Sequence, residues 1–219
     1  IGATGSGKTT LASLIPRFYD ATAGTVLVDG VDVRAYTFDA LYNKLGYVTQ
    51  KAVLFSGTVE DNVFFGQSAA EKTDASLQAA LSLSQAAEFV DKYPEKAAHP
   101  IAQLGRNVSG GQKQRLSIAR ALARKPEILI FDDSFSALDY KTDAVLREGL
   151  AKQLPGTTKI IVAQRISTIR NADQILVLDR GEIAGLGTHD ELMVSCPVYR
   201  EIAMSQLSEE ELKKGGVSK

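Results

Sequence analysis

The first ten residues carry the clearest chemical pattern in the chain. They match G-x-x-x-x-G-K-S/T, the pattern of a phosphate-binding loop, through Gly2, Ala3, Thr4, Gly5, Ser6, Gly7, Lys8 and Thr9, with Thr10 as a spare hydroxyl. Glycines let the backbone close around a polyphosphate and turn its N–H groups toward the oxygens. We expect Lys8 to reach the β- and γ-phosphates and the Thr9 hydroxyl to join the shell of Mg²⁺.

A flexible Gly/Ser loop that happens to contain a lysine is the alternative to this interpretation. It is disfavoured because Leu11, Leu14, Ile15 and Phe18 follow at helical spacing, so the loop leads directly into a helix. The pattern therefore predicts a site for a nucleoside triphosphate.

Two predicted strands end in polar side chains. Residues 45–49 predict a strand that delivers Gln50, which either contacts Mg²⁺ or the attacking water through its amide or is an ordinary loop glutamine. The apolar run 127–131 has the length of a buried parallel strand and ends in Asp132 and Asp133. We expect Asp132 to hold Mg²⁺ through water opposite Thr9, and Asp133 to lie beside the attacking water.

A second informative stretch is Ser109, Gly110, Gly111 and Gln112. Ser109 is a good helix N-cap, and Gln112 occupies the capping-box position, so the stretch could be only a helix start. However, two glycines at a cap leave bare N–H groups facing outward, which favours an anion supplied from elsewhere. Residues 136–139 then open a further helix, which extends through Leu150 and has Asp139 at its N-cap.

The remaining patterns describe the elements that position these residues. The Asp29-Gly30 pair within residues 24–33 predicts an antiparallel flap, residues 38–44 a short helix, and Thr58 a capped helix start. Residues 71–125 predict an inserted helical lobe, in which the pattern is helical and alanine-rich from 71 to 93. A buried strand at 158–163 and a hairpin formed by 173–178 and 182–185 follow. The fold class is α/β, with a mostly parallel sheet.

We expect one domain over residues 1–207 and a disordered tail over 208–219. Both histidines are expected at the surface, His99 in a solvated loop and His189 beside the Thr188 helix cap. Because the chain lacks an initiator Met and starts one residue before the loop, we expect the first strand of the domain to lie upstream.

The bulk composition narrows the classes of function. A net charge of −1 and the absence of a basic stripe argue against nucleic acid as a partner. The single cysteine, Cys196, excludes an internal disulfide and is expected to be an inert thiol in a reducing cytoplasm. No apolar run approaches the ~20 residues of a membrane span, and no signal peptide is present, so we expect this piece to be soluble.

In combination these motifs resemble the nucleotide-binding domain of ATP-binding cassette (ABC) transporters, over essentially the whole chain. The resemblance makes residues 2–9 the phosphate loop, Gln50 the Q-loop, residues 108–112 the family signature, residues 128–132 Walker B and residues 136–139 the D-loop. It implies a P-loop NTPase-like core and ATP with Mg²⁺ as cofactors. It also implies a second cassette, whose ATP is capped in trans by Ser109, Gly110, Gly111 and Gln112.

The sequences of residues 54–62 and 118–122 are most similar to those of exporter halves. The resemblance then implies a transmembrane domain upstream on the same polypeptide, a place at the cytoplasmic face of the membrane, and adenine contacts in that upstream part. The transported substrate would be decided there.

Two positions depart from the family pattern. Asp133 stands where the family has a catalytic Glu, and Gln164 where it has a switch His. Asp is shorter by about 1.5 Å, and Gln cannot become a cation. The pair resembles the degenerate half of heterodimeric bacterial multidrug exporters, which implies a slow ATP site here and a non-identical partner half. The alternatives are a homodimeric ABC ATPase with Asp133 as base and a regulatory ATP-binding protein without transport.

Overall fold

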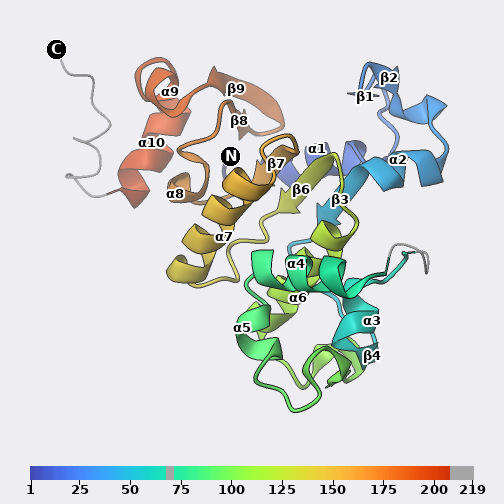
Figure 1. Ribbon diagram of the computed structural model, residues 1–219. Coiled ribbons are helices and arrows are strands. Elements are labelled where there is room, and N and C mark those ends of the chain that lie inside the picture. Colours follow the sequence, from blue (N-terminus) through green and yellow to red (C-terminus); the bar gives the residue numbers. More distant parts are fainter. Residues whose placement is uncertain (68–71, 208–219) are drawn as a thin grey trace. The chain divides into compact units, whose positions relative to one another are not determined.

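The structure is a computed structural model that describes residues 1–67 and 72–207 (Figure 1). The chain divides into two compact units, one formed by residues 1–24 with the chain from 161 onward and the other by residues 25–160. The tail predicted over 208–219 lies outside the described residues. In the part of the chain that the structure describes, no helix is both long and apolar enough to cross a membrane.

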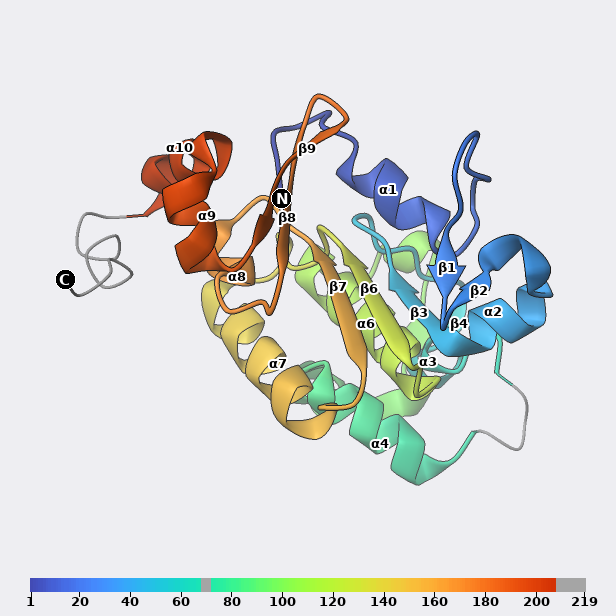
Figure 2. The same cartoon turned by 90° about the horizontal axis from the view of Figure 1, so that it is seen from above.

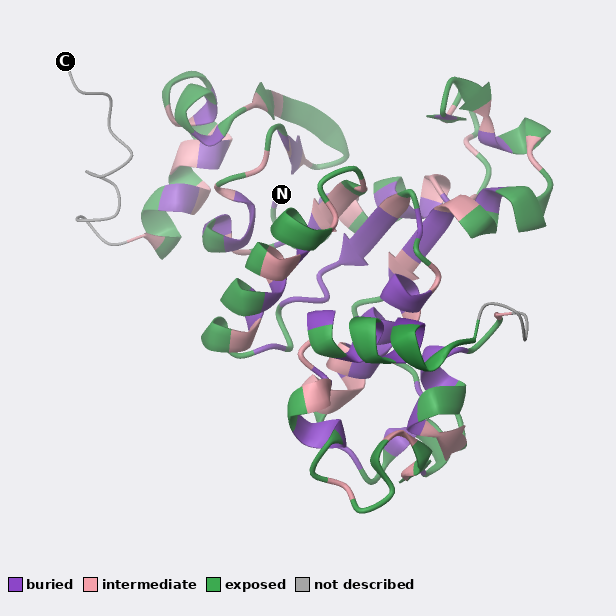
Figure 3. Cartoon of the chain, in the orientation of Figure 1, coloured by how far each residue is buried: buried purple, intermediate pink, exposed green. Residues whose placement is uncertain are grey.

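A mainly parallel sheet forms the centre of the unit 25–160, as predicted (Figure 2). Strand β3 (Leu45–Val48) runs parallel to β6 (Ile128–Asp132), with Gly46 opposite Leu129. Apart from Ile128 all of β6 is buried, which explains its unbroken apolar sequence (Figure 3). Strand β7 (Thr158–Val162) lies on the other side of β6, at one edge of the three-stranded sheet, and is half-buried at most positions, not buried as predicted.

The predicted flap and its helix are present. Strands β1 (Leu27–Val28) and β2 (Val31–Asp32) pair antiparallel around Asp29 and Gly30, whose φ angles of 50° and 76° suit a tight hairpin turn. A 3₁₀ turn at Val33–Ala35 leads to helix α2 (Phe38–Lys44), whose N-cap is Thr37.

Helices dominate the rest of this unit. Their bounds are α3 (Val59–Val63), α4 (Asp74–Leu83), α5 (Ala87–Val90), α6 (Gly110–Ala123) and α7 (Tyr140–Gln153), and they are accompanied by β4 (Gly57–Thr58), β5 (Pro100–Ile101) and 3₁₀ turns at Lys96–Ala98 and Gln103–Gly105. Helix α6 packs against α3, α4 and β3. The helical pattern predicted for this lobe appears as the two helices α4 and α5, which are separated at Gln85, whose φ is 61°.

The other unit contains α1 (Lys8–Leu14), α8 (Ile166–Ile169), β8 (Ile175–Asp179), β9 (Glu182–Gly187), α9 (His189–Ser195) and α10 (Pro197–Gln206). Strands β8 and β9 form the predicted hairpin. Ile1 donates to the Leu176 carbonyl at 2.8 Å and accepts from the Leu178 N–H at 2.8 Å, the pattern of a parallel neighbour of β8. Helix α1 is shorter than the apolar spacing predicts, and Phe18 beyond it is 51% exposed.

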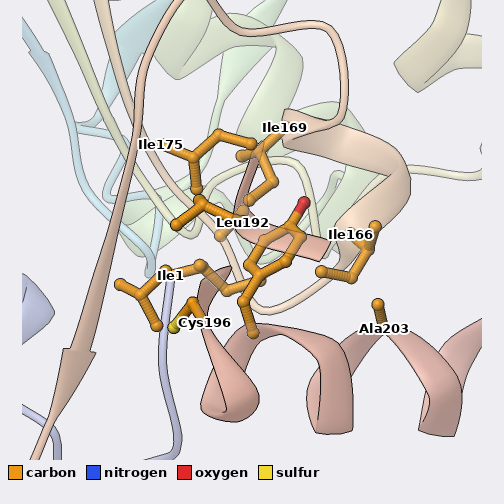
Figure 4. Packing of buried hydrophobic residues seen from close by; sticks show 10 residues of the cluster. Ile1, Ile166, Ile169, Ile175, Leu192, Cys196 and Ala203 are labelled. Atoms are coloured by element: carbon orange, nitrogen blue, oxygen red, sulfur yellow. The ribbon is translucent and has the colours of Figure 1, made fainter. Parts of the chain in front are cut away.

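One apolar cluster stabilises this unit (Figure 4). Its members come from the N-terminus, α8, β8, α9 and α10 and include Ile1, Ile166, Ile175, Leu192 and Ala203. Cys196 belongs to the cluster at 2% exposure, which agrees with the expected inert thiol. The start of the phosphate loop is therefore anchored in a packed core.

The expectation for His189 was wrong, because its ring is buried at 6% exposure and its Nδ1 lies 2.8 Å from the Tyr199 hydroxyl. Burial lowers the pKa of His189 below its ordinary value of 6.5, Arg170 lowers it further and Asp190 opposes this, while burial raises the pKa of Tyr199 to about 12. His99 is half-buried and stacks on Tyr93 with 3.7 Å between ring centroids.

The buried His189 predicts an acid-sensitive stability. The ring of His189 takes up a proton at a higher pH in the unfolded chain than in the folded chain. The stabilising contribution of the neutral, buried ring is therefore present above pH 6.5 and is lost as the pH falls below 6.5. We expect the melting temperature to fall between about pH 7.5 and about pH 5.5, and to fall less in His189→Gln. Thermal melts at both pH values check this, with His99→Gln as the control that removes the other histidine and leaves the buried ring in place. An equal drop in His189→Gln would contradict it.

Candidate functional site

The phosphate loop spans the connection between Ile1 and α1. Gly2 has a φ of +156°, and a Cβ there would lie 2.1 Å from the Leu178 carbonyl oxygen, so the loop can pass this close to β8 only with glycine. Gly7 caps α1 in the left-handed region at a φ of 95°. The Ser6 side chain is buried, while Ala3, Thr4, Gly5, Thr9 and Thr10 are exposed.

Lys8 lies over this loop. Its Nζ donates to the carbonyls of Gly2 and Ala3 at 2.8 and 2.7 Å, and Ser6 Oγ is 3.4 Å away. An ammonium held by two loop carbonyls is placed within the turn that the G-x-x-x-x-G-K pattern forms. The local geometry therefore fits the predicted role of Lys8 as a point charge for phosphate.

Gln164 belongs to the same unit, two residues after the end of β7, and its side chain is exposed. Its carbonyl accepts from Gln206 Nε2 at 2.8 Å, and Gln206 Oε1 accepts from the Ile166 N–H at 2.8 Å. Gln206, at the end of α10, thus fixes the turn that presents Gln164. Sequence reasoning missed this contact, although Tyr199, Ile202 and Ala203 at helical spacing after Pro197 could have indicated α10.

The unit 25–160 brings Gln50, Asp132 and Asp133 together. Asp132 ends β6 at 4% exposure, and the Tyr47 hydroxyl donates to its Oδ2 at 3.2 Å. Gln50 Nε2 donates to Asp133 Oδ2 at 3.0 Å. Asp133 itself has a φ of 46°, a conformation that non-glycine residues adopt mainly under local constraint. Tyr47 was not predicted as a site residue, and its place in the same strand, three residues before Gln50, is a weak signal.

The oxygen atoms in this group fit Mg²⁺. Carboxylate and amide oxygens are hard ligands, and Mg²⁺ bound with a nucleotide takes one or two carboxylates from the protein and completes its shell with water and phosphate oxygens. Because Gln50 donates through Nε2, its Oε1 is the atom that would face such an ion. The donor set therefore suits Mg²⁺, and Asp132 and Gln50 are the residues that would hold it.

Ser134, beside Asp133, is fully buried, and its Oγ has no hydrogen-bond partner among the described residues. Burying an unsatisfied hydroxyl costs about 1–3 kcal/mol. We therefore expect Ser134→Ala to raise the free energy of unfolding by about 1 kcal/mol in chemical denaturation. The matched control is Ser84→Ala, which removes an equally buried hydroxyl that donates to the Leu81 carbonyl at 3.1 Å and should destabilise. A destabilised Ser134→Ala would contradict this account.

The signature stretch has the predicted cap geometry. Gln112 N donates to Ser109 Oγ at 3.3 Å, and Gln112 Oε1 accepts from the Ser109 N–H at 2.8 Å, which completes a capping box. A Cβ added to Gly110 would meet nothing within 4 Å, whereas one on Gly111 would lie 3.5 Å from the Ala137 carbonyl. The packing of this chain therefore does not require a glycine at 110. Asp139 caps α7 by accepting from the Thr142 N–H at 2.9 Å.

Comparisons with known proteins agree with this arrangement. A family profile described as "ABC transporter" matches residues 1–136. The chain is similar to an ABC transporter ATP-binding protein of Mycobacterium tuberculosis, with 49% identity over 94% of this chain and 35% of the relative. It is also similar to an ATP-dependent lipid A-core flippase of Syntrophus aciditrophicus, with 41% identity over 97% of this chain and 35% of that protein.

Among solved structures, a bacterial Atm1-family ABC exporter with ATP bound superposes with a TM-score of 0.90 at 37% identity, over 95% of this chain and 36% of that one. The chain thus spans about a third of the length of the relatives it matches.

Proposed function

Because the chain belongs to the ABC transporter family, we propose that it is the ATP-binding cassette that energises export of a substrate across a membrane. In this proposal the phosphate loop, with Lys8 and Thr9, binds the phosphates of Mg-ATP, and Asp132 and Gln50 hold the metal. The domain spans residues 1–207 and works at the cytoplasmic face, with a transmembrane domain on the same polypeptide. The names of the flippase and exporter relatives support the exporter assignment.

We further propose that this chain's own ATP site is slow. Asp133 would be the general base, but its carboxylate is one C–C bond, about 1.5 Å, shorter than that of a glutamate. An error of roughly 1 Å at a reacting centre costs on the order of a hundredfold in rate. The Gln50 contact supports this, since it orients the Asp133 carboxylate but cannot extend it.

The signature stretch would serve the ATP of a partner cassette. The observation that carries this proposal is the position of Gly110, which opens α6 and has open space around it, so that the fold of this chain gives no reason for a glycine there. Gly156 is equally open but lies in a loop and not at the start of a helix. A glycine is explained if another molecule must approach the exposed start of α6 closely, and the bare N–H groups suit a phosphate. We propose a non-identical partner half that supplies the stronger base.

Gly110→Glu tests this role. Glutamate is favourable in the first turn of a helix, so the melting temperature and the affinity for ATP should be unchanged. The anionic side chain should repel the partner's phosphates and lower the ATPase rate of the assembled transporter by on the order of a hundredfold, the size of a lost phosphate-stabilising group. Gly156→Glu, in a loop where a Cβ also meets nothing within 4 Å, is the matched control. An unchanged rate in Gly110→Glu would rule out the role in trans.

A further inference from the structure

Helix α6 contains a buried amide that the proposed function does not use. Gln114 is 1% exposed, and its Nε2 donates to the Thr49 carbonyl at 3.2 Å. Apart from Ser117, the other buried residues of the helix, such as Leu116, Ile118 and Ala119, are apolar. Burying an amide costs free energy unless it is hydrogen bonded, so a methionine of similar size would fill this place at lower cost. The hydrogen bond from Gln114 to Thr49 therefore needs a functional explanation.

The Thr49 carbonyl belongs to the peptide unit that contains the N–H of Gln50. This unit is planar, so a hydrogen bond that fixes the carbonyl direction also restricts the backbone rotations on either side of it. Those rotations set the direction in which the Gln50 side chain leaves the end of β3. Gln50 Nε2 in turn donates to Asp133 Oδ2 at 3.0 Å. A continuous chain of contacts therefore leads from Gln114 through Gln50 to Asp133.

A second side chain of α6 holds the same segment farther along. Arg120 donates to the carbonyls of Asn62 and Val53 at 2.7 and 3.0 Å and to Asn62 Oδ1 at 2.9 Å. The Asn62 side chain in turn accepts from the Phe55 N–H through Oδ1 and donates to the Phe55 carbonyl through Nδ2, both at 2.9 Å. Arg120 thus fixes residues 53–62. The Thr49–Gln50 peptide precedes that range and is held by the Gln114 contact, together with a local one in which the Thr49 hydroxyl donates to the Lys51 carbonyl at 2.9 Å.

We propose that Gln114 is a positioning residue that sets the direction of Gln50, and through it the placement of the amide oxygen and of the Asp133 carboxylate. The helix that begins at the signature residues Ser109–Gln112 would then hold the metal-binding group of this chain's own ATP site. This inference rests on the proposed role of Gln50 toward Mg²⁺.

The test measures metal affinity, not turnover. Mn²⁺ replaces Mg²⁺ and is titrated into the full-length protein saturated with ATP, and free Mn²⁺ is read by electron paramagnetic resonance. We expect Gln114→Met to raise the Kd for Mn²⁺ roughly two- to tenfold, the size that one hydrogen bond supports, while ATP binding without metal is unchanged. Gln114→Asn, which shortens the amide by one bond, should act in the same direction if the methionine variant folds poorly.

Two further variants separate the possible outcomes. Gln50→Ala should raise the Kd for Mn²⁺, and adding Gln114→Met to it should cause no further rise, because both act through one side chain. Arg115→Gln is the matched control and should leave the Kd for Mn²⁺ unchanged. Arg115 lies on the same helix but donates to the Gln85 carbonyl and to Glu88, at 3.0 and 2.8 Å.

If Gln50→Ala raises the Kd but Gln114→Met does not, the inference is overturned and the proposed role of Gln50 stands. If Gln50→Ala has no effect, that role fails and the inference falls with it. Additive effects of the two changes would also overturn it.

Discussion

Replacing Lys8 with alanine is expected to weaken ATP binding by roughly tenfold to a hundredfold. The ammonium lies over the phosphate loop, and a hydrogen bond to a charged group contributes about 1.5–3 kcal/mol, which corresponds to that change in Kd. Calorimetric titration of the full-length protein with Mg-ATP measures it.

Lys159 offers a matched control for this change. Its Nζ also donates to two main-chain carbonyls, those of Leu154 and Thr157 at 2.6 and 2.9 Å. Lys159→Ala therefore removes comparable contacts with the backbone but should leave the affinity for ATP unchanged. If both variants bind ATP as the wild type does, Lys8 is not part of the site. If both lose affinity equally, the loss reflects backbone support and not the phosphate contact.

The combination of Asp133→Glu with Gln164→His is expected to raise the turnover of this chain's own site by on the order of tenfold or more, because a general base typically contributes about 10²–10⁴-fold. Glutamate restores about 1.5 Å of reach, and histidine restores a group that can donate as a cation. The gain should appear in kcat and not in KM, because the changes act on the transition state.

Steady-state ATPase assays of the wild type, both single variants and the double variant measure this gain. Asp133→Asn is the control that keeps the size of the side chain but removes the basic oxygen, so it should not gain. If the wild type already turns over rapidly and the double variant is no faster, Asp133 is already an adequate base. The homodimer would then be the better interpretation.

The parts of the fold that follow from local chemistry could be predicted. The capping boxes at Thr58, Ser109 and Thr188 and the turn at Asp29-Gly30 are present where the sequence places them. Each depends on side chains within three residues of one another, so the pattern and the structure contain the same information. The strand that ends in Asp132 was predictable for a similar reason, since a run of apolar residues needs burial on both faces.

Contacts between distant residues could not be predicted. Gln114 and Thr49 are 65 positions apart, and no periodicity indicates that this glutamine, and not an exposed one, faces the end of β3. His189 shows the same limit, because a helix cap fixes the backbone but not the direction of the ring. Its partner Tyr199 lies on α10, a helix that we did not predict.

The central claim is that this chain binds ATP well and hydrolyses it slowly. The most direct measurement compares two quantities in one preparation of the full-length protein without its partner half, the Kd for Mg-ATP and the rate of phosphate release at saturating ATP. The account predicts saturable binding that Lys8→Ala weakens roughly tenfold to a hundredfold. It also predicts a release rate that is a small fraction of the rate after the partner half is added. Rapid release by the protein alone, unchanged when the partner is added, would contradict it.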